Sequence, residues 1–134
     1  MEYFRVWLDD LRPAPSGWLW VKTVDECIAA LKRASVMEAF VEVSLDHDLA
    51  DEHLDDARSD YMSGGYMPHT YREKTGYHVV LWMAENDVWP DLIHLHTANP
   101  VGRDAMRACI LRHRPNRLDI VISYTEAYAE LMAR

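Results

Sequence analysis

Short apolar runs alternate with longer amphipathic segments along the whole chain. Strands of a buried parallel sheet read as short apolar runs, whereas apolar residues at helical spacing predict one buried helix face. On this basis we expect five strands, near residues 4–8, 18–21, 40–45, 92–96 and 117–123. The alternation predicts a three-layer doubly wound α/β domain of the flavodoxin or receiver-like type, with a parallel sheet of about five strands. The chain, 1–134, is expected to form a single domain.

Capping patterns show where the intervening helices begin. They occur at three places: Thr23 with Glu26, Asn99 with Pro100, and Ser123 with Glu126. They predict a helix after residue 23, a helix over 100–113 and a last helix ending near residue 134. A further helix is expected over 75–86, where apolar side chains lie on most sides and indicate deep burial.

Two segments do not fit a helix or a strand. Residues 12–17 contain prolines two positions apart, which remove backbone donors and fix φ, so they cannot form a regular helix. Residues 50–74 are polar and show no periodicity. A segment of this length within a compact domain is usually a functional lid or a disordered insert.

The composition excludes several classes of function. The net charge is −8, from 14 basic and 22 acidic residues, which argues against general binding of double-stranded nucleic acid. A small phosphate ligand stays possible, because a metal ion and a few arginines reverse the local field. No apolar run approaches the length of a membrane span, and the first residues do not form a signal peptide, so we expect a cytoplasmic protein. Cys27 and Cys109 fall on helix faces and read as small buried hydrophobic residues.

Acidic residues follow two of the expected strands, at the point where each strand ends. Asp9 and Asp10 come after the first apolar run, and Asp46-His47-Asp48 follows the run 40–45. In an open α/β sheet the carboxyl ends of parallel strands meet at one edge, where ligands bind. Carboxylates held together there repel one another unless a cation lies among them, and oxygen-only clusters suit Mg²⁺ or Mn²⁺. We therefore expect a divalent-metal site built from Asp9, Asp10, Asp46 and Asp48; the alternative is two solvated, acid-rich turns.

The fourth apolar run ends in residues that suit a phosphate ligand. His96 and Thr97 are expected at the same edge, where a histidine can transfer protons and a threonine can donate a hydrogen bond to a phosphoryl oxygen. His94, by contrast, reads as a core histidine satisfied by one hydrogen bond. Asn99 is first of all a helix cap, and the helix that follows directs its positive end at an anion. Arg103, in its first turn, is placed to clamp that anion.

These motifs resemble the cyclic-phosphate processing receiver domains, divergent relatives of the bacterial response-regulator receivers. The matching segments, in order, are 6–13 (VWLDDLRP), 44–49 (SLDHDL), 75–77 (TGY) and 96–103 (HTANPVGR). The resemblance implies a receiver-like fold and a role in handling cyclic phosphates, in RNA repair or phage-conflict systems. The insert at 50–74 and the segment after 113 fall outside it.

Ordinary receivers carry an acid pair, a phospho-accepting aspartate, a threonine or serine, and a lysine after strands one, three, four and five. Asp9, Asp10, Asp46 and Thr97 match the first four of these positions, but no lysine lies near the fifth expected strand. The resemblance thus makes phosphotransfer signalling through Asp46 the weakest of three hypotheses.

The first hypothesis is a metal-dependent phosphoesterase that opens a cyclic phosphate on a small nucleotide or an RNA end. In it the acids hold Mg²⁺ or Mn²⁺, His47 or His96 moves the proton, and Arg12 and Arg103 hold the phosphate, with Thr97 and Asn99 beside them. The second hypothesis is a non-catalytic receiver-like module that binds or sequesters a nucleotide or a partner. The sequence leaves the identity of the metal, the substrate and the oligomeric state open.

Overall fold

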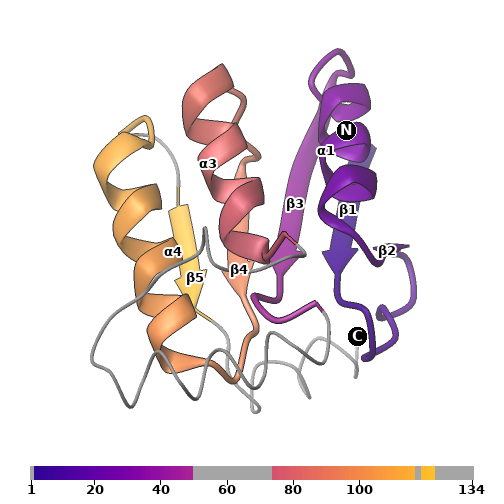
Figure 1. Ribbon diagram of the computed structural model, residues 1–134. Helices are drawn as coiled ribbons and strands as arrows, with labels where there is room; N and C mark the ends of the chain where they lie inside the picture. Colours follow the sequence, from indigo (N-terminus) through magenta and orange to yellow (C-terminus); the bar gives the residue numbers. More distant parts are fainter. Residues whose placement is uncertain (1, 50–73, 117–118, 123–134) are drawn as a thin grey trace.

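The computed structural model describes residues 2–49, 74–116 and 119–122, and every structural statement below concerns these residues. They form one parallel sheet with the strand order β2-β1-β3-β4-β5 (Figure 1). The strands are β1 (Glu2–Leu8), β2 (Leu19–Val21), β3 (Ala39–Leu45), β4 (Leu92–Leu95) and β5 (Asp119–Ile122). This is the flavodoxin-like order of doubly wound sheets, so the predicted fold class is confirmed.

Three helices pack against the sheet in the described part of the chain: α1 (Val24–Ala34), α3 (Gly76–Asn86) and α4 (Pro100–His113). Figure 1 shows them side by side over the strands. Alternate strand residues form one buried core with them, namely Val6 and Leu8 of β1, Val43 and Leu45 of β3, and Ile93 and Leu95 of β4. Because alternate residues of a strand face the same way, these contacts place all three helices on one face of the sheet, so the described residues show two of the three predicted layers.

The helix ends follow the capping patterns in the sequence. The Thr23 side chain accepts a hydrogen bond from the Glu26 N–H at 3.1 Å, and Asn99 accepts one from the Gly102 N–H at 3.0 Å. Each cap satisfies a backbone donor that the first helical turn leaves without a partner. The predicted boundaries of the helices over 75–86 and 100–113 agree with the structure within one residue.

The opposite face of the central strands carries polar and aromatic side chains. Glu42 lies there with an exposed fraction of 4%, between Arg5, whose Nε is 3.1 Å from its Oε1, and His94, whose Nε2 bonds its other oxygen. The expectation that His94 is a buried, hydrogen-bonded core histidine is confirmed. Trp7 and Trp18 pack edge to face beside this network, with ring centroids 6.0 Å apart.

Several expectations fall on residues that the structure does not describe. Nearly all of the insert, 50–73, and the last helix, after Ser123, lie outside the described residues.

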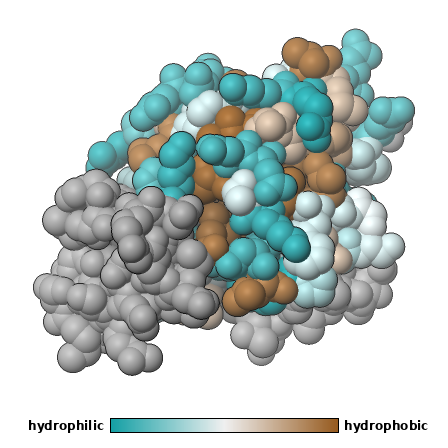
Figure 2. Space-filling view, turned by 45° about the vertical axis from the view of Figure 1, so that its right-hand side comes forward, coloured by the Kyte–Doolittle hydropathy of each residue, from teal (hydrophilic) through white to brown (hydrophobic). Residues whose placement is uncertain are grey.

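Cys27 and Cys109 are buried free thiols, as expected. In the described ranges, no helix combines the length and the apolar character that crossing a membrane requires. Figure 2 shows the described surface from the side of α1 and the first strands, with hydrophilic residues over much of it and hydrophobic ones between them.

Candidate metal and phosphate site

The strand register brings the predicted acids to one edge of the sheet. Leu8 is paired with Leu45, and Leu45 with Leu95, so the residues that follow them leave the sheet together. The hydrogen-bond ladder continues one residue further. The Asp46 N–H donates to the Leu8 carbonyl and the His96 N–H donates to the Leu45 carbonyl, both at 3.0 Å. The backbone therefore fixes where the side chains of residues 9, 46 and 96 begin.

Both carboxylate oxygens of Asp9 are engaged in hydrogen bonds. Its Oδ1 accepts from the backbone N–H groups of Leu11 at 2.9 Å and Arg12 at 2.8 Å. Its Oδ2 lies 2.7 Å from Arg12 Nε and 3.1 Å from His96 Nε2. Burial alone would raise the pKa of Asp9, but the His96 hydrogen bond, the two backbone donors and the Arg12 charge together hold that pKa below its usual value. Asp9 is thus a stable, oriented anion at the centre of the site.

The surroundings of Asp46 raise its pKa, whereas those of Asp9 lower it. Its burial and the negative charges of Asp9 and Asp48 raise the pKa of Asp46 to about 7, although Arg12 and a hydrogen bond from Thr97 act against this rise. The His47 N–H donates to Asp46 Oδ1 at 2.8 Å, which fixes the orientation of the carboxyl group. The protein therefore holds Asp46 as a carboxyl that loses its proton only near neutral pH, or earlier when a cation approaches.

Arg12 places a positive charge beside two of the buried acids. Its Nε contacts Asp9 Oδ2 and its Nη2 lies 3.4 Å from Asp46 Oδ2, so the guanidinium bridges the two buried acids. Burial works against the charged form, but attraction to Asp46 and Asp9 leaves the pKa of Arg12 above its ordinary value. Sequence reasoning expected Arg12 at the phosphate; the structure brings it to the acids themselves.

His96 is buried and has a partner on each ring nitrogen. Its Nδ1 lies 2.6 Å from Ser44 Oγ, its Nε2 faces Asp9, and the ring stacks on Trp7 with centroids 3.9 Å apart. A carboxylate can only accept, so Nε2 carries the proton and the Ser44 hydroxyl donates to Nδ1. Burial lowers the pKa of His96 to about 4, and the ring is neutral at pH 7. This geometry suits orienting the Asp9 carboxylate.

His47 lies on the other side of the site, packed under the first turn of α4. Its Nδ1 is 2.8 Å from Asp48 Oδ1, and the same oxygen accepts from Asn99 Nδ2 at 3.2 Å. Asn99 therefore caps α4 with its oxygen and holds Asp48 with its amide nitrogen. The Asp48 carboxylate orients the His47 ring, as an acid does in catalytic Asp–His pairs.

Two glycines allow the backbone to approach the site closely. A Cβ at Gly76 would lie 1.9 Å from the Asp46 carbonyl oxygen, and one at Gly102 would lie 2.5 Å from the His47 ring. The Gly76 N–H donates to the His47 carbonyl at 3.0 Å. Since a side chain at either position would push the acid loop away, both glycines are required for the geometry of residues 46–48.

The remaining predicted residues line the same edge without forming one contact group. Thr97 is buried, and its Oγ1 accepts from the Asn99 N–H at 3.1 Å in addition to its bond with Asp46. Arg103 lies in the first turn of α4, where its Nε is 3.3 Å from Asp104 Oδ1. Their predicted contacts with a phosphate stay predictions.

The donor set fits a hard divalent cation. Asp9, Asp10 and Asp46 each offer one carboxylate oxygen, and these atoms all lie within 4.8 Å of one another in the described residues. Such oxygen-only groups suit Mg²⁺ or Mn²⁺. Three ionised carboxylates with one guanidinium leave a net charge of −2, which a divalent ion would balance. The structure does not bring Asp48, the fourth predicted ligand, into this group, because its carboxylate holds His47 and Asn99.

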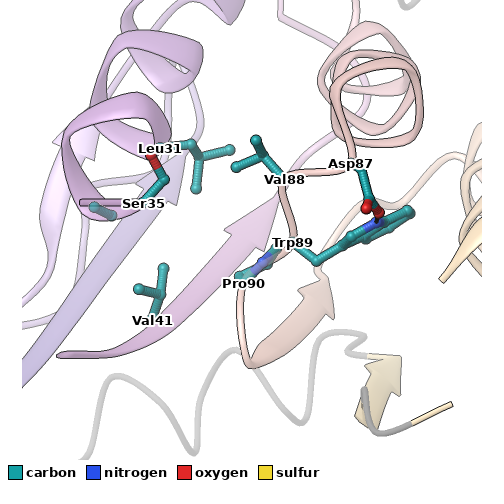
Figure 3. A pocket seen from close by; sticks show the side chains of 8 residues that line it. Leu31, Ser35, Val41, Asp87, Val88, Trp89 and Pro90 are labelled. Atoms are coloured by element: carbon teal, nitrogen blue, oxygen red, sulfur yellow. Dashed lines mark hydrogen bonds between the residues drawn. The ribbon is translucent and has the colours of Figure 1, made fainter. Parts of the chain in front are cut away.

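A cavity of about 340 Å³ lies at the other end of the sheet. It is lined by the ends of α1 and α3 and the approach to β4, with Leu31, Val41, Val88, Trp89 and Pro90 contributing apolar surface (Figure 3). Its acid, Asp87, accepts a hydrogen bond from Trp89 Nε1 at 3.1 Å. The cavity therefore does not share residues with the acid cluster.

The strand order, the acids at the carboxyl edge and Thr97 after β4 define the class of protein: a receiver-like α/β domain. A sequence profile of the family described as the cyclic-phosphate processing receiver domain matches residues 4–112. The chain belongs to this family, as the resemblance predicted. Neither the curated proteins nor the solved structures gave a match.

Sequence reasoning missed three residues that support the site. Ser44 bonds His96, the Trp7 indole donates to the Arg12 carbonyl at 2.9 Å, and the Trp20 indole donates to the Asp9 carbonyl at 2.6 Å. A signal was present for Ser44, because a polar residue within an apolar strand must find a buried partner. The two tryptophans read only as β-formers, and nothing in the sequence singles out the carbonyls that their N–H groups reach.

Proposed function

We propose that this domain is a metal-dependent phosphoesterase that opens cyclic phosphates on small nucleotides or RNA ends. The observation that carries the proposal is the group formed by Asp9, Asp10 and Asp46, whose oxygens lie within 4.8 Å at the carboxyl edge of the sheet. A divalent ion held there would neutralise the charge that builds on the phosphoryl oxygens. Membership of a family linked to cyclic-phosphate processing supports the choice of substrate class.

Ring opening consumes one water molecule. The water oxygen forms a bond to phosphorus and one ring P–O bond breaks. The water loses one proton, and the oxygen freed from the ring gains one. The products are a phosphomonoester and a hydroxyl group. The protein must therefore accept one proton and supply one.

The geometry favours His47 over His96 for this proton transfer. His96 uses both ring nitrogens on Ser44 and Asp9, so moving its proton would break the bond that orients Asp9. In His47 the Asp48 carboxylate engages Nδ1 and orients the ring, as in catalytic Asp–His pairs, and we assign the proton transfer to Nε2. Arg12, Thr97 and Arg103 are assigned to the phosphoryl oxygens.

The test is turnover of a panel of cyclic phosphates with Mg²⁺ or Mn²⁺. The panel contains 2′,3′-cyclic nucleotides, 3′,5′-cyclic nucleotides and a short RNA ending in a 2′,3′-cyclic phosphate, with products separated by chromatography. Asp46→Asn and His47→Gln should each lower the rate by about 10²–10⁴-fold. Asp25→Asn, an exposed substitution on α1 with the same loss of charge, should leave the rate unchanged.

Binding of Mn²⁺ is measured in parallel. If the metal binds and no member of the panel is turned over, the phosphoesterase proposal fails. Recovery of a tightly bound cyclic nucleotide in unchanged form would identify a non-catalytic binding module instead.

A further inference from the structure

The Arg12 guanidinium contacts two of the three acids that would hold a divalent ion. It bridges Asp9 and Asp46 at 2.7 and 3.4 Å, while about one third of its side chain stays exposed to solvent. It thus acts as a stand-in cation for two carboxylates that are buried side by side. A divalent ion on the same oxygens would place two like-signed groups next to each other, and they would repel.

The backbone of Arg12 is held in place, so the response to this repulsion falls to its side chain. Its backbone N–H donates to Asp9 Oδ1 at 2.8 Å, and its carbonyl accepts from the Trp7 indole at 2.9 Å. Pro13 follows and stiffens the chain. A displaced guanidinium therefore remains at the edge of the site, within reach of an anion that binds the metal.

We propose that Arg12 is a counterion switch: a divalent ion displaces its guanidinium from Asp9 and Asp46, and the released guanidinium becomes a ligand of the phosphate. Arg12 thereby weakens metal binding in the absence of substrate and strengthens phosphate binding in the presence of metal. The inference rests on the proposed function, because it takes the acid cluster as the metal site and a phosphate as its partner.

The switch predicts opposite effects of one substitution on two ligands. Arg12→Gln should bind Mn²⁺ alone at least about fivefold more tightly than the wild type, the lower end of ordinary coupling between two ligands. With the metal site saturated, the same variant should bind inorganic phosphate more weakly by a similar factor. A merely damaged site would bind both ligands more weakly.

The experiment titrates Mn²⁺ by the electron paramagnetic resonance signal of the free ion, and phosphate by calorimetry. Arg12→Lys keeps a positive charge and should retain weak Mn²⁺ binding, which separates the effect of charge from a change in packing. Arg33→Gln, exposed in the last turn of α1, removes one positive charge at the opposite end of the sheet and should change neither affinity.

Unchanged or weaker Mn²⁺ binding by Arg12→Gln overturns the inference, as does a failure of the wild type to bind Mn²⁺. Neither titration requires turnover. The expected pair of affinities in a protein without phosphoesterase activity would therefore support the switch while refuting the proposed reaction.

Discussion

Replacing Asp46 with asparagine should stabilise the metal-free protein at neutral pH and do so much less in acid. The pKa of Asp46 rises from 3.8 in the unfolded chain to about 7 in the folded protein, chiefly through burial. Between these values the unfolded chain releases a proton that the folded chain keeps, so the stability of the wild type falls as pH rises and levels off above pH 7. Asparagine has the same shape and no charge, so the variant does not lose this stability.

The magnitude follows from about 1.4 kcal/mol per pH unit. Between about pH 5 and about pH 7 the wild type loses stability with each pH unit, and above about pH 7 the loss stops. Two units correspond to about 3 kcal/mol, which is the upper limit of the advantage that Asp46→Asn gains between about pH 5 and about pH 8. Relaxation around the charge and weaker attraction to Arg12 reduce this figure, and we expect the advantage of Asp46→Asn to grow by about 1–3 kcal/mol over this range.

The measurement is the free energy of unfolding from urea titrations in the presence of a chelator, at both pH values, for wild type and variant. Asp25→Asn serves as the control, because it makes the same chemical change at an exposed position. If the stability difference between Asp46→Asn and wild type is the same at both pH values, Asp46 ionises normally and the electrostatic account of the site is wrong.

Three further outcomes are expected. Mg²⁺ or Mn²⁺ at a hundredfold excess over Kd should stabilise the protein by about 2.7 kcal/mol and raise the melting temperature by about 10 degrees, and Asp46→Asn should lose most of this response; an equal response in both proteins would speak against a metal site. Ser44→Ala leaves Nδ1 of the buried His96 without its donor and should cost about 1–3 kcal/mol in urea unfolding, whereas an unchanged midpoint would show that the bond contributes nothing. Gly102→Ala should cost a similar amount, because its Cβ would lie 2.5 Å from the His47 ring; wild-type stability would mean that the ring has room to move.

The position of the site could be predicted from the sequence because it depends on backbone order alone. Asp9 and Asp46 each follow directly after an apolar run, and parallel pairing of those runs places the two residues at one edge. The strong cap at Asn99 and Pro100 fixed the start of α4 in the same way. Local signals of this kind survive in any fold that keeps the strand order.

The pairing of side chains within the site could not be predicted, because it joins residues that are far apart in the sequence. His96 is separated from Ser44 by 52 positions and from Asp9 by 87, and alternation along a strand does not tell which of several polar neighbours a ring will reach. Arg12 is near Asp9 in sequence, but its contact with Asp46 depends on how far the side chain extends across two strand ends. Such side-chain contacts decide whether a residue orients a carboxylate or transfers a proton.

The two indole hydrogen bonds to the turn after β1 make the site optically visible. Trp7 and Trp20 donate to the carbonyls of Arg12 and Asp9, and Trp7 also lies flat against His96. Because indole emission responds to hydrogen bonding and to charge near the ring, a displacement of the Arg12 side chain or a change of charge at Asp9 will alter the intrinsic fluorescence of the protein. The chain thus carries an intrinsic fluorescent probe at the expected ligand site, and the rate of ligand binding can be measured in unlabelled protein.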